Sequence, residues 1–567
     1  MKKGRTTGAK ALVRTLEKRG TEIIFGYPGG ANLPVYEALE RSGIRHIQAR
    51  HEQGAAHMAD GYARATGKTG VCLATSGPGA TNLVTGIATA YMDSSPVIAI
   101  TGQVPRNMIG NDAFQEVDIT GITIPITKHN YLIQSASQVA PTVEEAFYLA
   151  DSGRRGPVLI DIPKDVMQED FALESEKNGA LEGYNPTVKG HPGQIKRAAS
   201  IIKEAERPVI IAGGGVFLSD AFASLSAFVE AVQIPLVYTL MGKSALDNRH
   251  PLNLGLYGYH GGRPANTAVT EADIIIAIGT RFGDRSTGPL AGFAKNTKIV
   301  HIDVDPAEIG KNVPAYLPIV GDIDHILPKL TSLLSSDTPR SKWYERWVKV
   351  TEEEKSKKLR RGFSKDQENS PAFTTASITE RAAEYFKEPV LVTDVGRHQI
   401  YAARYFPLAS GRTFISSGGL GTMGFGLPAA IGASIGLPDA QVLLITGDGS
   451  FLMNNQEIVT AAESDVDVTV LVMNDSRLGM IEQLQDSFYG AGFDVSRFPG
   501  DIRFDRLAET FGGTGYRVNN FEELDTSLAA ATKTRGIKVI DCKIEEETHV
   551  YPMVTGTHLL ELAEGEA

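Results

Sequence analysis

The sequence predicts an α/β protein of three domains, each built on a doubly wound parallel sheet. Apolar runs of strand length alternate with helix-like segments along the chain, which is the pattern of parallel sheets. At 567 residues the chain is too long for one core. Two polar stretches, residues 172–189 and 337–372, read as connections. We therefore expect domains at residues 1–171, 190–336 and 373–552.

Composition excludes several classes of protein. The net charge of −11 argues against a nucleic-acid or anionic-membrane partner, and the basic run Lys355–Arg361 is better explained as a solvated helix face. The only cysteines, Cys72 and Cys542, lie in strand-like runs, which fits a reducing compartment. The first twenty residues predict a helix rather than a signal peptide, and no run is long enough to cross a membrane. We expect a cytoplasmic protein.

The first domain begins the β–α alternation. Val71–Thr75, Val97–Thr101 and Val158–Ile162 are strand-like, and the first two end in glycine-containing turns. Glu52 follows another strand-like run, Ile44–Ala49, and opens an alanine-rich helix. A carboxylate in that position is either a helix-start charge or a catalytic group, and the residues alone leave both open.

The second domain repeats the pattern with strands predicted at Val209–Ala212, Asp273–Ile278 and Ile299–Asp303. Three glycines, Gly213–Gly215, follow the first of these strands, where a backbone can approach a ligand closely. Such loops also occur in domains that bind nothing, so this signal is weak by itself.

The third domain contains the most informative stretch. The apolar run Val442–Thr446 leads into Gly447–Ser450, and a second run, Val468–Met473, is followed by an Asn-Asp pair that ends at Asp475. Because ligands bind beyond the carboxyl ends of parallel strands, Asp448 and Asp475 are expected to lie at one edge of the sheet. Glycines beside a carboxylate suit a Mg²⁺–diphosphate site, although an ordinary aspartate in a glycine turn is the alternative.

Taken together, these segments resemble a known family. HEQGAAHMADGYARATGK, beginning at His51, combined with GDGSF and VMND, resembles the thiamine-diphosphate enzymes. Further motifs, spread over residues 5–555, narrow the resemblance to the catalytic subunits of acetolactate (acetohydroxyacid) synthase. They are GQVP from Gly102, DAFQE from Asp112, TKHN from Thr127, SGRRGPV from Ser152, TLMGK from Thr239, RFGDR from Arg281, SGGLGTMGFGLP from Ser417 and LGM from Leu478.

This resemblance implies an activity and a set of partners. Pyruvate would be decarboxylated and joined to a second 2-keto acid, pyruvate or 2-oxobutanoate, in the biosynthesis of isoleucine and valine. Thiamine diphosphate, Mg²⁺ and FAD would be the cofactors, and Glu52 would contact the aminopyrimidine of the first. The site would form between domains of different subunits, so a homodimer is the smallest expected unit, with a tetramer and a small regulatory subunit as further possibilities.

The resemblance also assigns positions. The expected substrate-channel residues are Phe114, Gln115 and Lys164. The expected Mg²⁺ ligands are Asp448, Asp475 and the backbone carbonyl of Arg477. The expected thiamine-diphosphate contacts are Val395, Gly396, Arg397, His398, Gly421, Met423, Gly447, Gly449, Ser450, Met453 and Met480. The expected FAD contacts are Arg154, Gly213, Gly214, Gly215, Thr239, Leu240, Met241, His260, Gly279, Arg281, Asp284, Arg285, Asp303 and Asp322.

Three residues depart from the family pattern. Asp475 stands where asparagine is commoner, Gly283 where aspartate is usual, and Leu484 where a tryptophan shapes the pocket for the second keto acid. Two alternatives stay open. One is another decarboxylase, carboligase or oxidase of the same cofactor family, although Glu52 speaks against a glyoxylate carboligase. The other is a catalytically silent flavin-binding protein.

Overall fold

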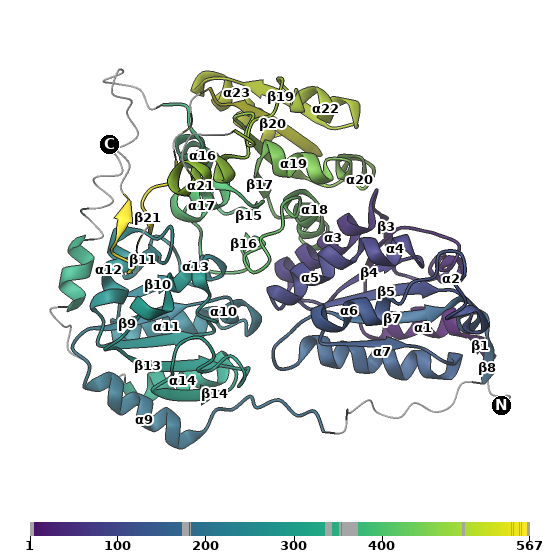
Figure 1. The fold of residues 1–567 in the computed structure, drawn as a ribbon, viewed down its shortest axis with the longest axis horizontal. Coiled ribbons are helices and arrows are strands. Elements are labelled where there is room, and N and C mark those ends of the chain that lie inside the picture. The colour runs from purple at the N-terminus through teal and green to yellow at the C-terminus, as the bar shows by residue number, and fades with distance from the viewer. Residues whose placement is uncertain are drawn as a thin grey trace.

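Three parallel sheets organise the chain in a computed structural model (Figure 1), which describes residues 5–172, 181, 183–334, 343–350, 353, 372–489, 494–545, 547, 549–554, 556 and 558–563. Each sheet has six strands, and all of its neighbouring pairs are parallel. The predicted three-domain α/β fold is therefore confirmed. Of the two expected connections, 172–189 is described in part, 337–372 lies largely outside the described residues, and Lys355–Arg361 lies wholly outside them.

The first sheet has the strand order β3-β2-β4-β5-β7-β6. Its strands are β2 (Ile23–Gly26), β3 (Arg45–Gln48), β4 (Gly70–Ala74), β5 (Val97–Gln103), β6 (His129–Leu132) and β7 (Val158–Pro163). Its helices are α1 (Gly8–Lys18), α2 (Leu33–Leu39), α3 (Glu52–Thr66), α4 (Pro78–Asn82), α5 (Val84–Met92), α6 (Ile119–Thr123), α7 (Ala136–Asp151) and α8 (Lys164–Gln168). A short antiparallel pair, β1 (Arg5–Thr7) and β8 (Asp170–Ala172), joins the two ends of this domain.

The central sheet has the order β11-β10-β9-β12-β13-β14. Its strands are β9 (Pro208–Ala212), β10 (Leu236–Tyr238), β11 (Asn253–Leu256), β12 (Ile274–Ile278), β13 (Lys298–Asp303) and β14 (Leu317–Val320). Its helices are α9 (Pro192–Lys203), α10 (Gly215–Leu218), α11 (Phe222–Val232), α12 (Arg263–Glu271), α13 (Asp284–Thr287) and α14 (Ile323–Leu334). All five residues of β9 and of β12 are buried, which explains their continuous apolar character.

The third sheet has the order β16-β15-β17-β18-β20-β19. Its strands are β15 (Val390–Thr393), β16 (Phe414–Ile415), β17 (Val442–Gly447), β18 (Val468–Asn474), β19 (Thr514–Val518) and β20 (Ile537–Lys543). Its helices are α16 (Thr375–Tyr385), α17 (Arg397–Tyr405), α18 (Gly426–Gly436), α19 (Asp448–Asn454), α20 (Glu457–Glu463), α21 (Gly479–Phe488), α22 (Phe504–Thr510) and α23 (Phe521–Ala531). A hairpin of β21 (Met553–Val554) and β22 (Leu562–Ala563) follows.

Strand order places the ligand-binding edges. In each sheet, successive strands are added first toward one edge and then toward the other. This reversal falls between β2 and β4 in the first sheet, between β9 and β12 in the central sheet and between β15 and β17 in the third. Loops that leave such a pair diverge, and the crevice between them is where open α/β sheets bind ligands. Each crevice is lined by a turn singled out from the sequence: Ser76–Gly79 in the first domain, Gly213–Gly215 in the centre and Gly447–Ser450 in the third.

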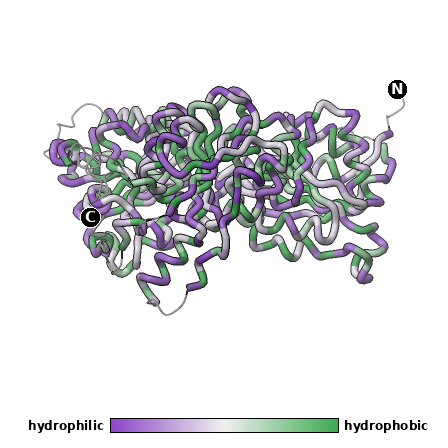
Figure 2. Tube along the Cα trace, turned by 90° about the horizontal axis from the view of Figure 1, so that it is seen from above, coloured by the Kyte–Doolittle hydropathy of each residue, from purple (hydrophilic) through white to green (hydrophobic). Residues whose placement is uncertain are grey.

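The first and third domains share one apolar core through α3 and α18. Hydrophobic residues from both helices belong to a single buried cluster, and Figure 2 shows hydrophobic and hydrophilic stretches alternating along the chain trace. The two helices approach so closely that a Cβ on Gly61 would overlap the carbonyl of Ala429, and a Cβ on Gly432 would overlap that of Met58. Glycine at both positions permits this contact. The alanine-rich helix after Glu52 is therefore an interdomain contact as well as a domain element.

Candidate functional site

Two carboxylates meet at the edge of the third sheet, as the strand ends predicted. Asp448 is the first residue of α19 and only 2 % exposed, and Asp475 follows the end of β18. Asp448 accepts hydrogen bonds from the backbone N–H groups of Gly449 at 2.6 Å and Arg477 at 3.2 Å. Burial, followed by the negative charge of Asp475, raises the pKa of Asp448 to about 7.

The orientation of the Asn-Asp pair distinguishes its two members. Asn474 is turned into the sheet, where its side-chain amide donates to Asp541 at 2.8 Å and to the carbonyl of Ile502 at 3.2 Å. Asp475 instead lines the cavity and forms an ion pair with Arg397. Only the second of the two residues is therefore placed to offer an oxygen to a ligand beside Asp448.

A helix N-terminus opens beside these carboxylates. α17 starts after β15 at Arg397, and its N-cap residue, Gly396, has no side chain to satisfy the first N–H groups. His398 is buried, and its Nε2 atom has no hydrogen-bond partner among the described residues. Burial lowers the pKa of His398 to about 3, so its ring is neutral and its one N–H is directed to the backbone of Asp394. A Cβ on Gly447 would lie 3.0 Å from the His398 Nδ1 atom, so a larger residue in this turn would press on the His398 ring.

Asp394 is a residue of this site that the sequence reasoning missed. It lies at the end of β15, is 1 % exposed, and accepts hydrogen bonds from the N–H groups of Val395, Gly424 and Gly426 at 2.9–3.1 Å. It thereby ties the loop that carries Gly421 and Met423 to the strand end. Its position directly before the Val-Gly-x-His motif was the available signal. Burial raises its pKa to about 6.

The turns of the central and third domains open into one cavity of about 1280 Å³, which residues of the first domain also line. This volume exceeds the few hundred to about 1,000 Å³ of an ordinary small-molecule site, so there is room for more than one ligand. The predicted thiamine-diphosphate and metal residues that line it are Val395, Gly396, Arg397, His398, Gly421, Met423, Gly447, Asp448, Gly449, Ser450, Asp475, Arg477 and Met480. Met453 does not line it and is 53 % exposed.

The central domain supplies the other wall. The predicted FAD residues that line the cavity are Arg154, Gly214, Gly215, Thr239, Leu240, Met241, His260, Gly279, Arg281, Asp284, Arg285, Asp303 and Asp322. Gly213 is the exception, because it packs directly against the backbone of Gly279 beneath the cavity. The Nδ1 atom of His260 and the Oε2 atom of Glu308 are buried without a hydrogen-bond partner in the described part of the chain.

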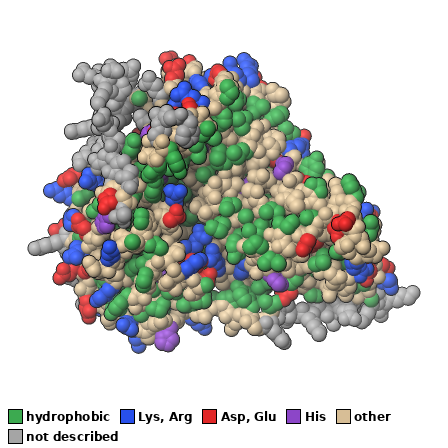
Figure 3. All heavy atoms as spheres, viewed as in Figure 1, with side chains coloured by type: hydrophobic (Ala, Val, Ile, Leu, Met, Phe, Trp, Pro, Cys, Tyr) green, Lys and Arg blue, Asp and Glu red, His purple; other side chains and the backbone are tan. Residues whose placement is uncertain are grey.

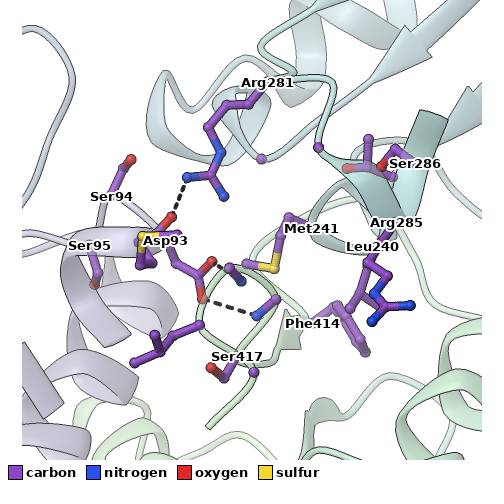
Figure 4. A pocket seen from close by; sticks show the side chains of 18 of the residues that line it. Asp93, Ser94, Ser95, Leu240, Met241, Arg281, Arg285, Ser286, Phe414 and Ser417 are labelled. Atoms are coloured by element: carbon purple, nitrogen blue, oxygen red, sulfur yellow. Dashed lines mark hydrogen bonds between the residues drawn. The ribbon is translucent and has the colours of Figure 1, made fainter. Parts of the chain in front are cut away.

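Asp93, which no motif identified, connects the first and third domains beside the cavity shown in Figure 4. Its carboxylate accepts hydrogen bonds from the backbone N–H groups of Gly418 at 3.1 Å and Gly419 at 2.7 Å. It also pairs with Arg64 of α3 at 3.1 Å. On the opposite side, Arg281 of the central domain donates to the carbonyl of Met92. In Figure 3, lysine and arginine side chains gather near the middle of the face that is turned toward the viewer.

Glu52 lies apart from this cavity within the chain. It is the first residue of α3, is 9 % exposed, and does not line the cavity; its Oε2 atom accepts a hydrogen bond from Asn82 at 2.9 Å. The backbone just before it is held by Glu457 of the third domain, which accepts from the N–H groups of Arg50 and His51 at 3.0–3.1 Å. Glu457 was also missed, because its partner lies about 400 residues away in the sequence.

The expected channel residues belong to the first domain, as Glu52 does, and not to the cavity wall. Phe114 is 88 % exposed, and neither it nor Gln115 or Lys164 lines the cavity. Gln115 lies against the Ser76–Gly79 turn, since a Cβ on Gly77 would be 2.8 Å from the Gln115 Cα atom. The structure thus divides the predicted residues into a cavity group and a first-domain group.

The cavity group fits an anionic cofactor with a divalent cation. Two adjacent acids supply oxygen ligands, while an uncapped helix N-terminus supplies N–H donors for phosphate oxygens. A complete metal site is not formed by side chains alone: the described residues hold no cluster of three His, Cys, Asp or Glu residues around a common point.

No helix in the described ranges is long and apolar enough to cross a membrane.

Comparison with known proteins agrees with this arrangement. Three family models match: the N-terminal TPP binding domain of thiamine pyrophosphate enzymes at residues 6–122, their central domain at 195–330 and their C-terminal TPP binding domain at 394–542. The chain therefore belongs to the thiamine pyrophosphate enzymes.

Individual relatives identify the branch of this family. A probable acetolactate synthase large subunit from Methanocaldococcus jannaschii is 48 % identical over 96 % of this chain and 93 % of its own length. An acetolactate synthase from Arthrospira platensis is 44 % identical over 98 % of this chain and 97 % of its own. An acetolactate synthase large subunit from Haemophilus influenzae is 41 % identical over 96 % of both. Within the thiamine pyrophosphate enzymes, the chain belongs to the acetolactate synthase family.

Proposed function

We propose that this protein decarboxylates pyruvate and joins the remaining two-carbon unit to a second 2-keto acid, forming acetolactate or acetohydroxybutyrate. The observation that carries the proposal is the pairing of Asp448 with Asp475 beside the open N-terminus of α17, at the reversal point of the third sheet. The full-length similarity to acetolactate synthases supports it.

Thiamine diphosphate, when bound, supplies the nucleophilic carbon and the electron sink for decarboxylation. The N–H groups at the start of α17 would hold the diphosphate, with His398 beside them, and Asp448, Asp475 and the Arg477 carbonyl would hold Mg²⁺. Met480 and Met423 present apolar surface to the same space. Because α17 and α19 start at adjacent strand ends, the anion and the cation would be positioned together.

Glu52 would complete the site from a second copy of the chain. A carboxylate that accepts a hydrogen bond from the aminopyrimidine ring favours the protonation state that removes a proton from the reacting carbon. In one chain Glu52 lies outside the cavity, and both halves expose apolar side chains. The exposed residues in the first domain are Tyr27, Leu33, Met108, Phe114 and Ile124; those in the third are Leu420, Met453, Ile481, Phe488 and Tyr489. Faces of this kind suit a homodimer.

FAD and a regulatory subunit complete the proposal. The central-domain wall, with its glycine turns and the unpartnered His260 nitrogen, offers space and a hydrogen-bond acceptor for FAD, which would not be consumed. Gly283, also on this wall, lacks the carboxylate that is usual there in the family. Since several relatives are named large subunits, a small partner chain is part of the proposal. We place the protein in the cytoplasm.

Product analysis tests the function. Purified protein with thiamine diphosphate and Mg²⁺ is given pyruvate alone, or pyruvate with 2-oxobutanoate, each with and without an electron acceptor. Acetolactate from pyruvate, and acetohydroxybutyrate from the mixture, support the proposal. Acetaldehyde as the main product indicates a decarboxylase, and product formation that requires the acceptor indicates an oxidase. Absence of cofactor-dependent CO₂ release supports a silent flavin-binding protein.

A further inference from the structure

Five charged side chains gather at the proposed metal site, and their pairing is uneven. Asp448, Asp475, Arg397 and Arg477 line the cavity, and Glu482 lies behind them as an ion-pair partner of both arginines. The guanidinium of Arg397 bonds Asp475 and lies 3.5 Å from Glu482, whereas the guanidinium of Arg477 bonds Glu482. Asp475 is therefore paired with an arginine.

The Arg397–Asp475 contact is buried and fitted to its surroundings. The side chains of Arg397 and Asp475 are 5 % and 13 % exposed. A Cβ on Gly479 would overlap the Arg397 guanidinium, so the start of α21 is shaped around this side chain. Removing one partner from a buried ion pair is costly, because the other charge is then left without compensation. A cation that approaches Asp475 must therefore compete with Arg397.

An anion on the other side of Arg397 changes this competition. Arg397 is the first residue of α17, the helix end proposed to hold the diphosphate, and it lines the same cavity as Gly396 and His398. Arginine binds phosphate oxygens and carboxylates with the same planar set of donors. A bound diphosphate therefore offers Arg397 a replacement partner and leaves Asp475 free to ligate the metal.

We propose that Arg397 is a positioning residue that withholds Asp475 from the divalent cation until an anionic diphosphate takes its place as the partner of Arg397. The inference rests on the proposed function, which supplies both ligands. Beyond that function, we infer that the cation binds weakly when no diphosphate is present because Arg397 competes for Asp475. This effect is separate from the bonds that the metal would make to phosphate oxygens.

Mn²⁺ binding to the full-length protein, measured by electron paramagnetic resonance with no diphosphate present, tests this role. We expect Arg397→Gln to bind Mn²⁺ roughly tenfold to a hundredfold more tightly than wild type, the range that corresponds to a hydrogen bond between charged partners. Arg477→Gln is the matched control, because it removes a positive charge near Asp475 without contacting that residue. The difference between Arg397→Gln and wild type should largely disappear in the presence of saturating thiamine diphosphate.

The proposal is overturned if Arg397→Gln and Arg477→Gln tighten Mn²⁺ binding equally, or if neither does. A double-mutant cycle gives a second criterion: Arg397→Gln should have no more effect than Arg477→Gln once Asp475 is already asparagine. Arg397→Lys, which keeps the charge but loses the forked donors, replaces Arg397→Gln if that variant does not fold, and should tighten binding by a smaller factor. Failure of every variant to bind Mn²⁺ even with thiamine diphosphate would instead refute the metal site itself, and the proposal with it.

Discussion

Buried carboxylates dominate the chemistry of single residues in this protein. Burial raises the pKa of Asp161 and Glu457 to about 7, as it does for Asp448. Asp161 accepts hydrogen bonds from Thr101 and Gln103 inside the first domain, and Glu457 accepts from backbone N–H groups at the start of α3. These acids resist ionisation in the folded chain, so they connect its stability to pH.

Replacing Glu457 by glutamine should flatten the pH dependence of stability. The folded pKa of about 7 lies above the ordinary 4.5, so this group stabilises the fold at low pH and loses that contribution as the pH rises from 4.5 through 7. We expect wild type to lose on the order of 2 kcal/mol more than Glu457→Gln over this interval. Urea unfolding at pH 5 and pH 7.5 measures the difference. Glu463→Gln, on the exposed side of the same helix, should match wild type; equal slopes in all three proteins would contradict the assignment.

Leu484 should determine the response to inhibitors that stack on an aromatic ring. It lines the cavity at the position where the family usually has tryptophan. We expect weak inhibition of wild type by such compounds and, in Leu484→Trp, inhibition roughly two- to tenfold stronger, the usual gain from one aromatic pair. Dose–response curves for both proteins measure this, with Ile481→Trp on the same helix as the control. Potent inhibition of wild type would refute the prediction.

At the scale of elements, the decisive contacts are backbone atoms held by side chains of another domain. Asp93 holds the N–H groups of Gly418 and Gly419, and Glu457 holds the start of α3. In both cases a carboxylate from one domain orders a loop or helix end of another. The cavity wall therefore depends on interdomain packing.

Asp93→Asn should loosen the loop that carries Gly421 and Met423. An amide offers one acceptor where the carboxylate offers two, and Arg64 would keep only Asp60 as a charged partner. We expect a loss of about 1–3 kcal/mol in stability and weaker binding of thiamine diphosphate. Urea unfolding and fluorescence titration with the cofactor measure these effects. Asp165→Asn removes an acid from an exposed ion pair with Arg106 and should change neither quantity; an Asp93→Asn protein with unchanged cofactor affinity would disprove the role.

For the whole molecule, the separation of Glu52 from the cavity is the central fact. Both regions belong to one chain, and their domains share a core through α3 and α18. The chain nevertheless exposes the Glu52 region and the cavity region as separate halves. A dimer with two equivalent sites follows if each site takes one half from each chain.

Mixing two inactive variants tests this arrangement. Glu52→Gln and Asp448→Asn should each abolish most turnover while keeping the fold. When the two are unfolded and refolded together, half of the dimers are mixed, and each mixed dimer has one intact site, so we expect roughly a quarter of wild-type activity. Acetolactate formation measures the recovery, and each variant refolded alone is the control. No recovery, despite mixed dimers detected by differential tags, would place Glu52 and Asp448 of one chain in the same site.

Much of the fold followed from local patterns. The apolar runs at Val209–Ala212 and Val442–Thr446 became fully buried parallel strands, and the glycine turns after them lie at the reversal points of their sheets. The orientation of Asp475 toward the cavity also agrees with the sequence-based expectation. Met453 and Gly213 were expected to contact cofactors, yet neither lines the cavity, because a motif does not specify which way a side chain points.

The sequence by itself determined the class of fold, the positions of the strand-end turns and the kinds of residue available for chemistry, because those properties depend on neighbours along the chain. Tertiary structure alone decided which acids meet which partners. Arg397 reaches Asp475 across 78 residues, and Asp93 reaches Gly419 across 326. Such contacts depend on how sheets and domains pack, and no local pattern encodes them. The same packing keeps Glu52 outside the cavity that holds Asp448.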